Sequence, residues 1–253
     1  MNKESLYVRS VLKALLVLEQ FNDQGEKGIN QLSVCTGLPA STVQRIVNTL
    51  ELKNYLMQNP KTNKYRLGFA LYNISKNFSE DFSWVEAARC HLEKLVQKHK
   101  ETVNLAVLQG NNIVYLTKVD SPHILRPNFK VGTKYPAYCT SLGKCLLAHL
   151  PPEILNRFIS TTPLEPYTEN TITDPEKLKT ELYKTRERGY AVDDEEFQDG
   201  LYCLAAPVKN RKGKVVAAIS FTAPKTRMPA ETLPEIINDL LKAAGAISAE
   251  ITS

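Results

Sequence analysis

The sequence predicts an α+β protein in which a small helical module precedes a larger domain of mixed helices and strands. In residues 29–67, two short helical stretches separated by Gly37-Leu38-Pro39 are followed by a short hairpin. From Thr102 onward, strand-like runs flank Gly110-Asn111-Asn112, and further runs of this kind alternate with helical ones up to the C-terminus. Hairpins interleaved with helices predict an antiparallel sheet flanked by helices.

The N-terminal module is expected to contain three helices. The first covers residues 6–21 and is mostly apolar over residues 12–17. The last covers residues 41–52, where Val43, Ile46, Val47 and Leu50 fall at the spacing of one helical face. This stripe predicts a helix that packs its apolar back against the other two.

The opposite face of helix 41–52 carries the side chains that matter for function. At about 100° per residue, Ser41, Gln44, Arg45 and Asn48 gather there, and we add Thr42 from the start of the same helix. Arg, Gln and Asn are the side chains that read base edges in the major groove. A short helix of this kind after a tight turn is typical of a recognition helix.

A basic hairpin follows this helix directly. Residues 56–58 and 64–67 are expected strands around a turn at residues 59–63, which contains Pro60. Lys61, Lys64 and Arg66 make the hairpin basic, and it contains no acidic residue. A basic wing beside a recognition helix can neutralise phosphates, so the module is expected to bind double-stranded DNA. The ordinary alternative is a solvated helix pair and hairpin in an unrelated domain.

Charge and composition agree with this prediction. The 253-residue chain carries a net charge of +5, and residues 1–72 account for +4 of it, with nine Lys and Arg against five Asp and Glu. Nothing resembles a membrane span or the apolar core of a signal peptide, so we expect a cytoplasmic protein that does not bind membranes. The five cysteines contain no C-x-x-C pair and the four histidines are scattered, so no metal site and no cofactor are expected.

The larger domain is predicted as a series of helices and strands after a linker helix at 69–82. A helix over 85–100 leads into strands at 103–109 and 113–119 and a third at 126–131. The remaining expected helices cover 140–150, 152–159, 175–188 and 231–251, and the remaining strands cover 190–193, 203–209 and 215–222. The mixture predicts a sheet with helices packed against it.

One candidate binding segment is Tyr138–Lys144. Thr140 or Ser141 can cap the following helix, whose first N–H groups lack internal partners, and such a helix start attracts anions. Gly143 lacks a Cβ, so a ligand could approach its main chain closely. The ordinary alternative is a plain capped helix. A nucleotide P-loop is excluded, because that pattern requires Gly at 138 and Ser or Thr at 145.

A second candidate is the acidic run at 193–196. Its carboxylates could serve as acid and base or bind a hard cation, although acidic runs are more often solvated turns. Cys203 is expected in an apolar strand and is typical of a core residue. Ser220 and Thr222 lie two apart in a strand, so they project to one face, where buried hydroxyls need partners such as a polar ligand.

Three separated motifs make the chain resemble the IclR family of bacterial transcriptional regulators along nearly its whole length. They are TGLPASTVQRIVNTLE with YRLG at 65–68, VGTKYPAYCTSLGKCLLA at 131–148 and RGYAVDDEEFQDGLYCLAAPV at 188–208. The resemblance implies a winged helix-turn-helix domain over 1–68, a linker helix over 69–83, and an effector-binding domain similar to GAF and PAS folds over 84–253. It also implies homodimers, often paired into homotetramers, on palindromic operators.

The resemblance further implies an effector pocket for a small organic acid or an aromatic compound. By motif position, the pocket would include Gly143 with Ser141, Leu142, Asp193, Cys203, Ser220 and Thr222, and it would be lined by Tyr135 and Leu201. Many relatives have a small residue at the position of Leu142.

Two other functions stay open at this point. Cys139, Cys145 or Cys203 could act as a nucleophile with a histidine base, which would make residues 84–253 an enzyme. The chain could also be a DNA-binding architectural protein that takes no ligand. The sequence leaves open the effector, the operator, and whether transcription is repressed or activated.

Overall fold

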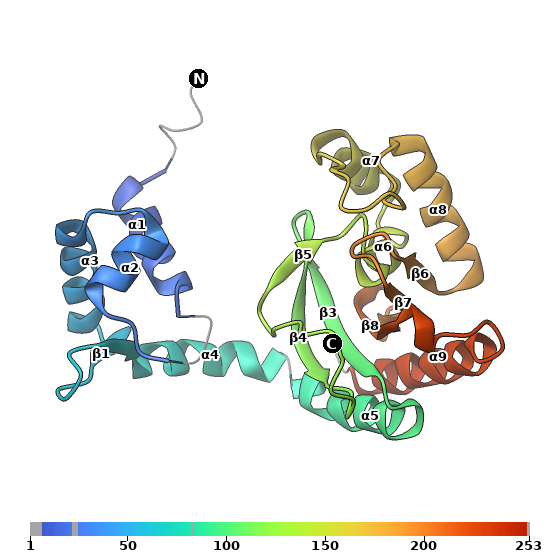
Figure 1. The fold of residues 1–253 in the computed structure, drawn as a ribbon, viewed down its shortest axis with the longest axis horizontal. Coiled ribbons are helices and arrows are strands. Elements are labelled where there is room, and N and C mark those ends of the chain that lie inside the picture. The colour runs from blue at the N-terminus through green and yellow to red at the C-terminus, as the bar shows by residue number, and fades with distance from the viewer. Residues whose placement is uncertain (1–6, 22–24, 82, 252–253) are drawn as a thin grey trace. The chain divides into compact units, whose positions relative to one another are not determined.

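The computed structural model describes residues 7–21, 25–81 and 83–251. The chain divides into two compact units, Met1–Asp81 and Phe82–Ser253 (Figure 1). Residue 6, with which the predicted helix 6–21 begins, lies outside the described residues.

The first unit has the predicted order of a winged helix-turn-helix. Helices α1 (Arg9–Glu19), α2 (Ile29–Thr36) and α3 (Ala40–Leu52) precede strands β1 (Leu56–Gln58) and β2 (Tyr65–Leu67), and α4 (Phe69–Asp81) follows. Gly37 ends α2 in the left-handed region, at φ 67°, which turns the chain into α3. The core contains Val17, Phe21, Leu32, Val43, Val47, Leu56 and Tyr65, so the apolar stripe of α3 faces inward as predicted.

The second unit is built on one six-stranded antiparallel sheet in the order β5-β4-β3-β8-β7-β6. Its strands are β3 (Thr102–Gln109), β4 (Asn112–Val119), β5 (Lys134–Pro136), β6 (Ala191–Asp194), β7 (Leu201–Lys209) and β8 (Val215–Pro224). Its helices are α5 (Ser83–His99), α6 (Ser141–Leu147), α7 (Pro152–Thr161), α8 (Pro175–Arg188) and α9 (Leu233–Glu250).

The two faces of this sheet bury different sets of side chains. Alternate residues of the central strands, among them Val103, Leu204 and Phe221, face α5 and α9 in one apolar cluster. Their neighbours, among them Ala205 and Ala218, face α6, α7 and α8 in a second cluster. Figure 1 shows the two helix layers on opposite sides of the sheet. Because both faces are covered, polar residues that point toward α6 are removed from water.

One predicted strand is wrong. Residues 126–131 form no strand, and the strand that pairs with β4 is Lys134–Pro136, with Tyr135 opposite Ile113. The run 126–131 instead carries Phe129, which packs its ring against the second cluster. A single buried aromatic residue in a loop resembles the alternation of a strand when only a few residues are available.

Gly143 is required by the packing of α6. A Cβ on Gly143 would lie 2.0 Å from the carbonyl oxygen of Ala137, which is main chain and cannot withdraw easily. The absence of a side chain therefore allows the chain itself to pass close to α6. The main chain of Ala137 thus occupies the space that the sequence analysis left open to a ligand.

We predict that Gly143→Ala lowers the free energy of unfolding by about 1–3 kcal/mol or more, because overpacking forces the main chain to shift. Gly245→Ala is the matched control, since Gly245 is also helical and has nothing within 4 Å of the new Cβ. The control should stabilise the protein by about 0.5–1 kcal/mol. Urea unfolding followed by the fluorescence of Trp84, the single tryptophan, measures both. Equal effects of the two substitutions would contradict the assignment.

Candidate functional site

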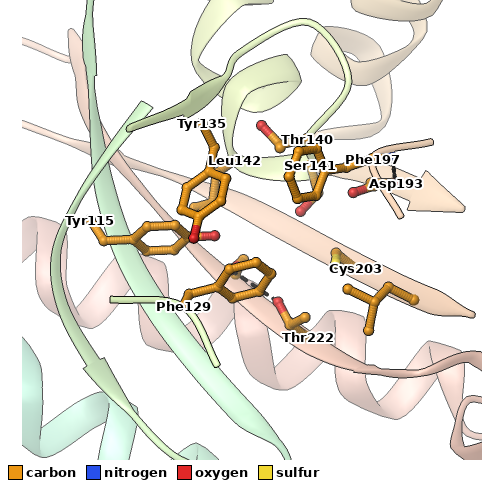
Figure 2. Close-up of a pocket in the computed structure, with 12 residues that line it drawn as sticks. Tyr115, Phe129, Tyr135, Thr140, Ser141, Leu142, Asp193, Phe197, Cys203 and Thr222 are labelled. Carbon is orange, nitrogen blue, oxygen red and sulfur yellow. Dashed lines mark hydrogen bonds between the residues drawn. The ribbon is translucent and has the colours of Figure 1, made fainter. Parts of the chain in front are cut away.

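A pocket lies between the α6 face of the sheet and the start of α6 (Figure 2). Eight of the nine residues expected to bind an effector line it: Tyr135, Ser141, Leu142, Asp193, Leu201, Cys203, Ser220 and Thr222. Gly143 does not line it. The structure therefore gathers residues from β5, α6, β6, β7 and β8 around one site.

Four residues outside the expected nine also line the pocket: Tyr115, Phe129, Phe197 and Thr140, of which only Thr140 belongs to a segment that was a candidate from the sequence. Tyr115 lies on β4, and Phe129 and Phe197 lie in loops, where no periodic pattern marks an inward-facing ring. Tyr115 and Ile113 lie two residues apart and project to the same face of β4. This spacing is the one sequence signal for Tyr115.

Thr140 holds the start of α6 at the pocket wall. Its hydroxyl accepts a hydrogen bond from the N–H of Gly143 at 3.2 Å and donates one to the carbonyl oxygen of Pro136 at 2.9 Å. Thr140 is thus the capping residue, which leaves the hydroxyl of the neighbouring Ser141 available to the pocket. Ser141 and Leu142 are almost completely buried.

The acidic run divides into a buried and a half-buried pair. Asp193 and Glu196 are buried, whereas Asp194 and Glu195 form ion pairs with Lys225 at 2.7 and 2.5 Å near the surface. The expectation of a solvated turn is therefore wrong for half of the run. Among the described residues, no group of His, Cys, Asp and Glu is suited to hold a metal ion.

Asp193 is a carboxylate held in the pocket wall by main-chain donors. It accepts hydrogen bonds from the N–H groups of Glu196 at 2.8 Å and Phe197 at 3.4 Å. Burial raises the pKa of Asp193 to about 6, and the nearby Lys144 and these N–H groups oppose the rise. The Asp193 carboxyl group therefore takes up a proton more readily than an exposed aspartate does.

Lys144 and Glu196 form a buried ion pair beside Asp193. The Lys144 ammonium donates to a carboxylate oxygen of Glu196, and Glu181 lies 4.0 Å from the same ammonium. Desolvation raises the pKa of Glu196 to about 7, against the attraction of Lys144. Arg188 in turn pairs with Glu181 at 2.7 Å, so the buried lysine belongs to a network that joins α6, α8 and the segment after β6.

Aromatic rings close the other side of the pocket. Phe129 stacks on Tyr115 at 5.4 Å between ring centroids, and Tyr135 meets Phe129 and Phe197 edge to face at 5.3 and 5.4 Å. Figure 2 shows Tyr115, Phe129 and Tyr135 close together on one side. The remaining cavity is only about 10 Å³, roughly enough for one water molecule. A ligand larger than this requires the rings to move.

A wider groove adjoins the closed pocket. Its volume is about 450 Å³, and it shares Phe129, Tyr135, Phe197 and Leu201 with the pocket. The same four side chains therefore separate the pocket from the groove. Their displacement would join the two spaces.

The buried cysteines are poorly suited to nucleophilic catalysis. Burial raises the pKa of Cys139, Cys145 and Cys203, which disfavours the thiolate that a nucleophile requires. His149 contacts the main-chain carbonyl oxygen of Cys145 at 2.8 Å rather than its sulfur. These geometries favour a structural role for the thiols.

The residues expected to contact DNA lie on the outer surface of the first unit. Ser41, Arg45 and Asn48 are exposed on α3, and Thr42 and Gln44 are half-buried. The Gln44 side-chain amide donates to the Asn48 side-chain oxygen at 2.8 Å. Lys61, Lys64 and Arg66 are exposed on the hairpin.

The hairpin is fixed to the rest of the first unit by contacts that the sequence did not indicate. Glu26 accepts hydrogen bonds from the Asn59 amide and the Thr62 hydroxyl, both at 2.6 Å. Lys27 and Tyr65 exchange two main-chain hydrogen bonds at 2.9 Å, which extend the two-stranded sheet. The basic side chains therefore project from a wing that is anchored at its turn and at its second strand.

Comparison with known families explains this combination of units. Residues 10–60 match the model for the IclR helix-turn-helix domain, and residues 80–249 match that for the C-terminal domain of the bacterial transcriptional regulator IclR. The chain belongs to the IclR family. It is therefore a DNA-binding transcriptional regulator, and its second unit corresponds to the effector-binding domain of this family.

Individual relatives agree along the whole chain. The transcriptional regulator KdgR of Escherichia coli is 34% identical over 99% of this chain and 95% of its own length. An IclR homologue from Microbacterium hydrocarbonoxydans, solved in complex with 4-hydroxybenzoate, is 27% identical with a TM-score of 0.83 over 96% of this chain and 98% of its own. The IclR protein of Thermotoga maritima is 28% identical with a TM-score of 0.77 over 98% of this chain and 100% of its own.

None of the described helices is both long and apolar enough to cross a membrane.

We predict that Lys144→Met destabilises the protein by about 3–5 kcal/mol, because it leaves the buried Glu196 carboxylate without its cation. Adding Glu196→Leu should restore most of this loss, since the double variant buries no unpaired charge. Lys179→Met is the control, because Lys179 pairs with Glu176 at 2.8 Å on the surface and should matter little. Urea unfolding measures all three, and a Lys144→Met effect as small as the control would refute the role of the pair.

Proposed function

We propose that this IclR-family regulator binds a palindromic operator as a homodimer and that a small acid in the pocket controls this binding. The observation that carries the proposal is the pocket itself. Hydroxyl groups line one part of it, aromatic rings close another, and Asp193 lies at its wall. The regulators found among its relatives are not enzymes, and we propose the same for this chain, whose buried thiols have raised pKa values.

In the proposed DNA complex, α3 enters the major groove. Arg45 is exposed and would most naturally pair with guanine, while Gln44 or Asn48 would pair with adenine. The Gln44–Asn48 hydrogen bond would orient both amides before DNA binds. Lys61, Lys64 and Arg66 would hold phosphates without reading sequence.

A second copy of the chain is the proposed partner of the first unit. Helix α1 and its N-cap residue expose one apolar row, Val8, Val11, Leu12, Leu15 and Leu16, although the helix buries Val17 in the core. Exposed apolar rows of this size mark association surfaces, and one winged module offers only one recognition helix to a palindrome. Two dimers could pair further into a tetramer. Light scattering that shows a monomer at micromolar concentration with full operator affinity would contradict this assembly.

The proposed effector is a hydroxy acid, a keto acid or a hydroxylated aromatic acid. Its carboxylate would lie at the hydroxyls of Ser141, Ser220 and Thr222 and would accept hydrogen bonds from Ser141 and Ser220, because charge-assisted hydrogen bonds are the strong ones. Its apolar part would contact Tyr135 and the other rings, and Asp193 would accept from a hydroxyl at the far end. The solved relative that holds 4-hydroxybenzoate has a ligand of this chemistry.

The closed cavity suggests how the effector acts. Since about 10 Å³ admits no acid of this size, the bound form must hold Phe129, Tyr135 or Phe197 in another position. An effector changes operator affinity only if it binds the DNA-competent and DNA-incompetent forms differently. The displaced rings are the proposed structural difference between those forms.

We predict that Arg45→Ala weakens operator binding by about 1–3 kcal/mol and relaxes the preference at one base position. Lys61→Ala and Lys64→Ala should each weaken binding to all sequences and reduce the salt dependence by about one unit of slope. Lys212→Ala, an exposed lysine in the β7–β8 turn, is the matched control. Fluorescence anisotropy over a salt series measures these effects. Unchanged affinity in all three variants would reject the placement of α3 and the wing.

We predict that the acid identified by a thermal-shift screen binds Ser220→Ala about ten- to a hundredfold more weakly, since one hydrogen bond to a charged group is lost. Operator binding without ligand should stay unchanged, because Ser220 lies in the pocket. Calorimetry with the identified acid measures the dissociation constant, and Asp193→Asn provides a second pocket variant. The pocket assignment fails if both variants bind the acid as tightly as the parent.

A further inference from the structure

A buried amide underlies the two hydroxyls of the pocket. Asn104 on β3 is completely buried and lies directly opposite Ser220 in the sheet. Its Nδ2 donates to the Ser220 Oγ at 3.2 Å and to the Thr222 Oγ1 at 3.3 Å. Asn104 does not itself line the pocket.

The orientation of the Asn104 amide follows from the free-energy cost of the opposite orientation. Among the described residues, the Asn104 Oδ1 is buried without a hydrogen-bond partner. If the amide were turned over, an NH₂ group with two donors would take that place, while the oxygen would accept from both hydroxyls. Burying two unsatisfied donors costs more than burying one unsatisfied carbonyl oxygen, so the observed orientation is favoured.

The amide therefore decides where the hydroxyl protons point. Both hydroxyl oxygens accept from the Asn104 Nδ2, so neither proton can be directed at that nitrogen. Thr222 lies opposite Cys203 in the sheet and Cys203 lies opposite Asp193, and the thiol interacts with both of these side chains. Asn104, Thr222, Cys203 and Asp193 thus form a row of side chains that begins at an NH₂ donor and ends at a carboxyl group. Each member therefore donates to the next, in the direction from β3 to β6.

Ser220 remains the hydroxyl whose proton the row does not use. Its nearest acceptor in the row is the Thr222 Oγ1, at 3.5 Å, which is the limit of a hydrogen bond. The Ser220 side chain lines the pocket. Its proton is thus directed to whatever occupies the pocket, and a carboxylate oxygen is the acceptor that gains most from it.

We propose that Asn104 is a specificity-determining residue that makes the pocket floor a hydrogen-bond donor and thereby selects carboxylates over their neutral amides. It is a positioning residue that holds Ser220 and Thr222, and the donor that it leaves to the pocket is the Ser220 hydroxyl. The inference rests on the proposed function of the pocket and adds the residue that sets its preference for anions.

The test compares each of three acids with its own amide: 4-hydroxybenzoate with 4-hydroxybenzamide, pyruvate with pyruvamide, and gluconate with gluconamide. Calorimetry on the full chain gives the ratio of the two dissociation constants for the acid that binds most tightly. The parent should favour the acid by at least about tenfold, the size of one charge-assisted hydrogen bond. In Asn104→Leu, which removes the donor without adding a charge, the ratio should fall toward one.

Asn104→Asp supplies a carboxylate in place of the NH₂ donor, so both hydroxyls turn their protons toward it. This variant should bind the acid at least tenfold more weakly than the parent while keeping its affinity for the amide. Thr102→Val is the matched control. Thr102 is buried on the same strand opposite Thr222, but its hydroxyl accepts from the N–H of Ser121 at 3.1 Å. The control should keep the parental ratio.

Three outcomes would overturn the inference, and each means something different. If the parent binds an acid and both Asn104 variants weaken acid and amide equally, Asn104 has only a structural role and the proposed effector class still stands. If the parent binds none of the three acids, the proposed function of the pocket fails and the inference fails with it. If Thr102→Val changed the ratio of the two dissociation constants as much as the Asn104 variants do, the assignment to Asn104 would also be rejected.

Discussion

The buried ion pair between Lys144 and Glu196 is the interaction on which the pocket depends. It joins α6 to the segment after β6, and the N–H of Glu196 also donates to Asp193 at 2.8 Å. A lysine with 1% exposure is costly to bury unless its charge is paired, so α6 and this segment must stay together. The two parts of the wall that carry Ser141 and Asp193 are therefore held in a fixed relation.

The antiparallel sheet supplies the floor of the same site. Residues directly opposite each other in β6, β7 and β8 place Asp193, Cys203 and Thr222 in one row, and Asn104 extends it to β3. A shift of one residue in any of these pairings would turn the polar side chains into the apolar cluster beneath α5 and α9. The large apolar residues on that other face thus fix the register that the polar row requires.

The site combines a rigid floor with a wall that must change. Hydrogen bonds and an ion pair hold the polar side, whereas Phe129, Tyr135 and Phe197 are held by ring packing and fill the cavity. Ring contacts are non-directional compared with hydrogen bonds, so the aromatic side is the part that can rearrange at lower cost. The polar side of the pocket would then bind the effector, and the aromatic side would change conformation in response.

The sequence by itself determined the order of the elements and the family. Helical spacing in α3, the turn at Gly37 and the hairpin around Gly110 are local signals, because periodicity and turn chemistry act over a few residues. Eight residues of the pocket were also predictable, through the family motifs. The strand expected at 126–131 failed because a short stretch with one buried ring has too few residues to define a period.

Only the tertiary structure decided which of these residues contact one another. It assigned the space above Gly143 to Ala137, paired Lys144 with Glu196 across 52 positions, and placed Asn104 beneath hydroxyls 116 and 118 positions away. It also placed Phe129 and Phe197 from two separate loops at one cavity. Such pairings have no local signature, because burial and hydrogen-bond satisfaction are properties of the folded chain and are fixed only when distant segments meet.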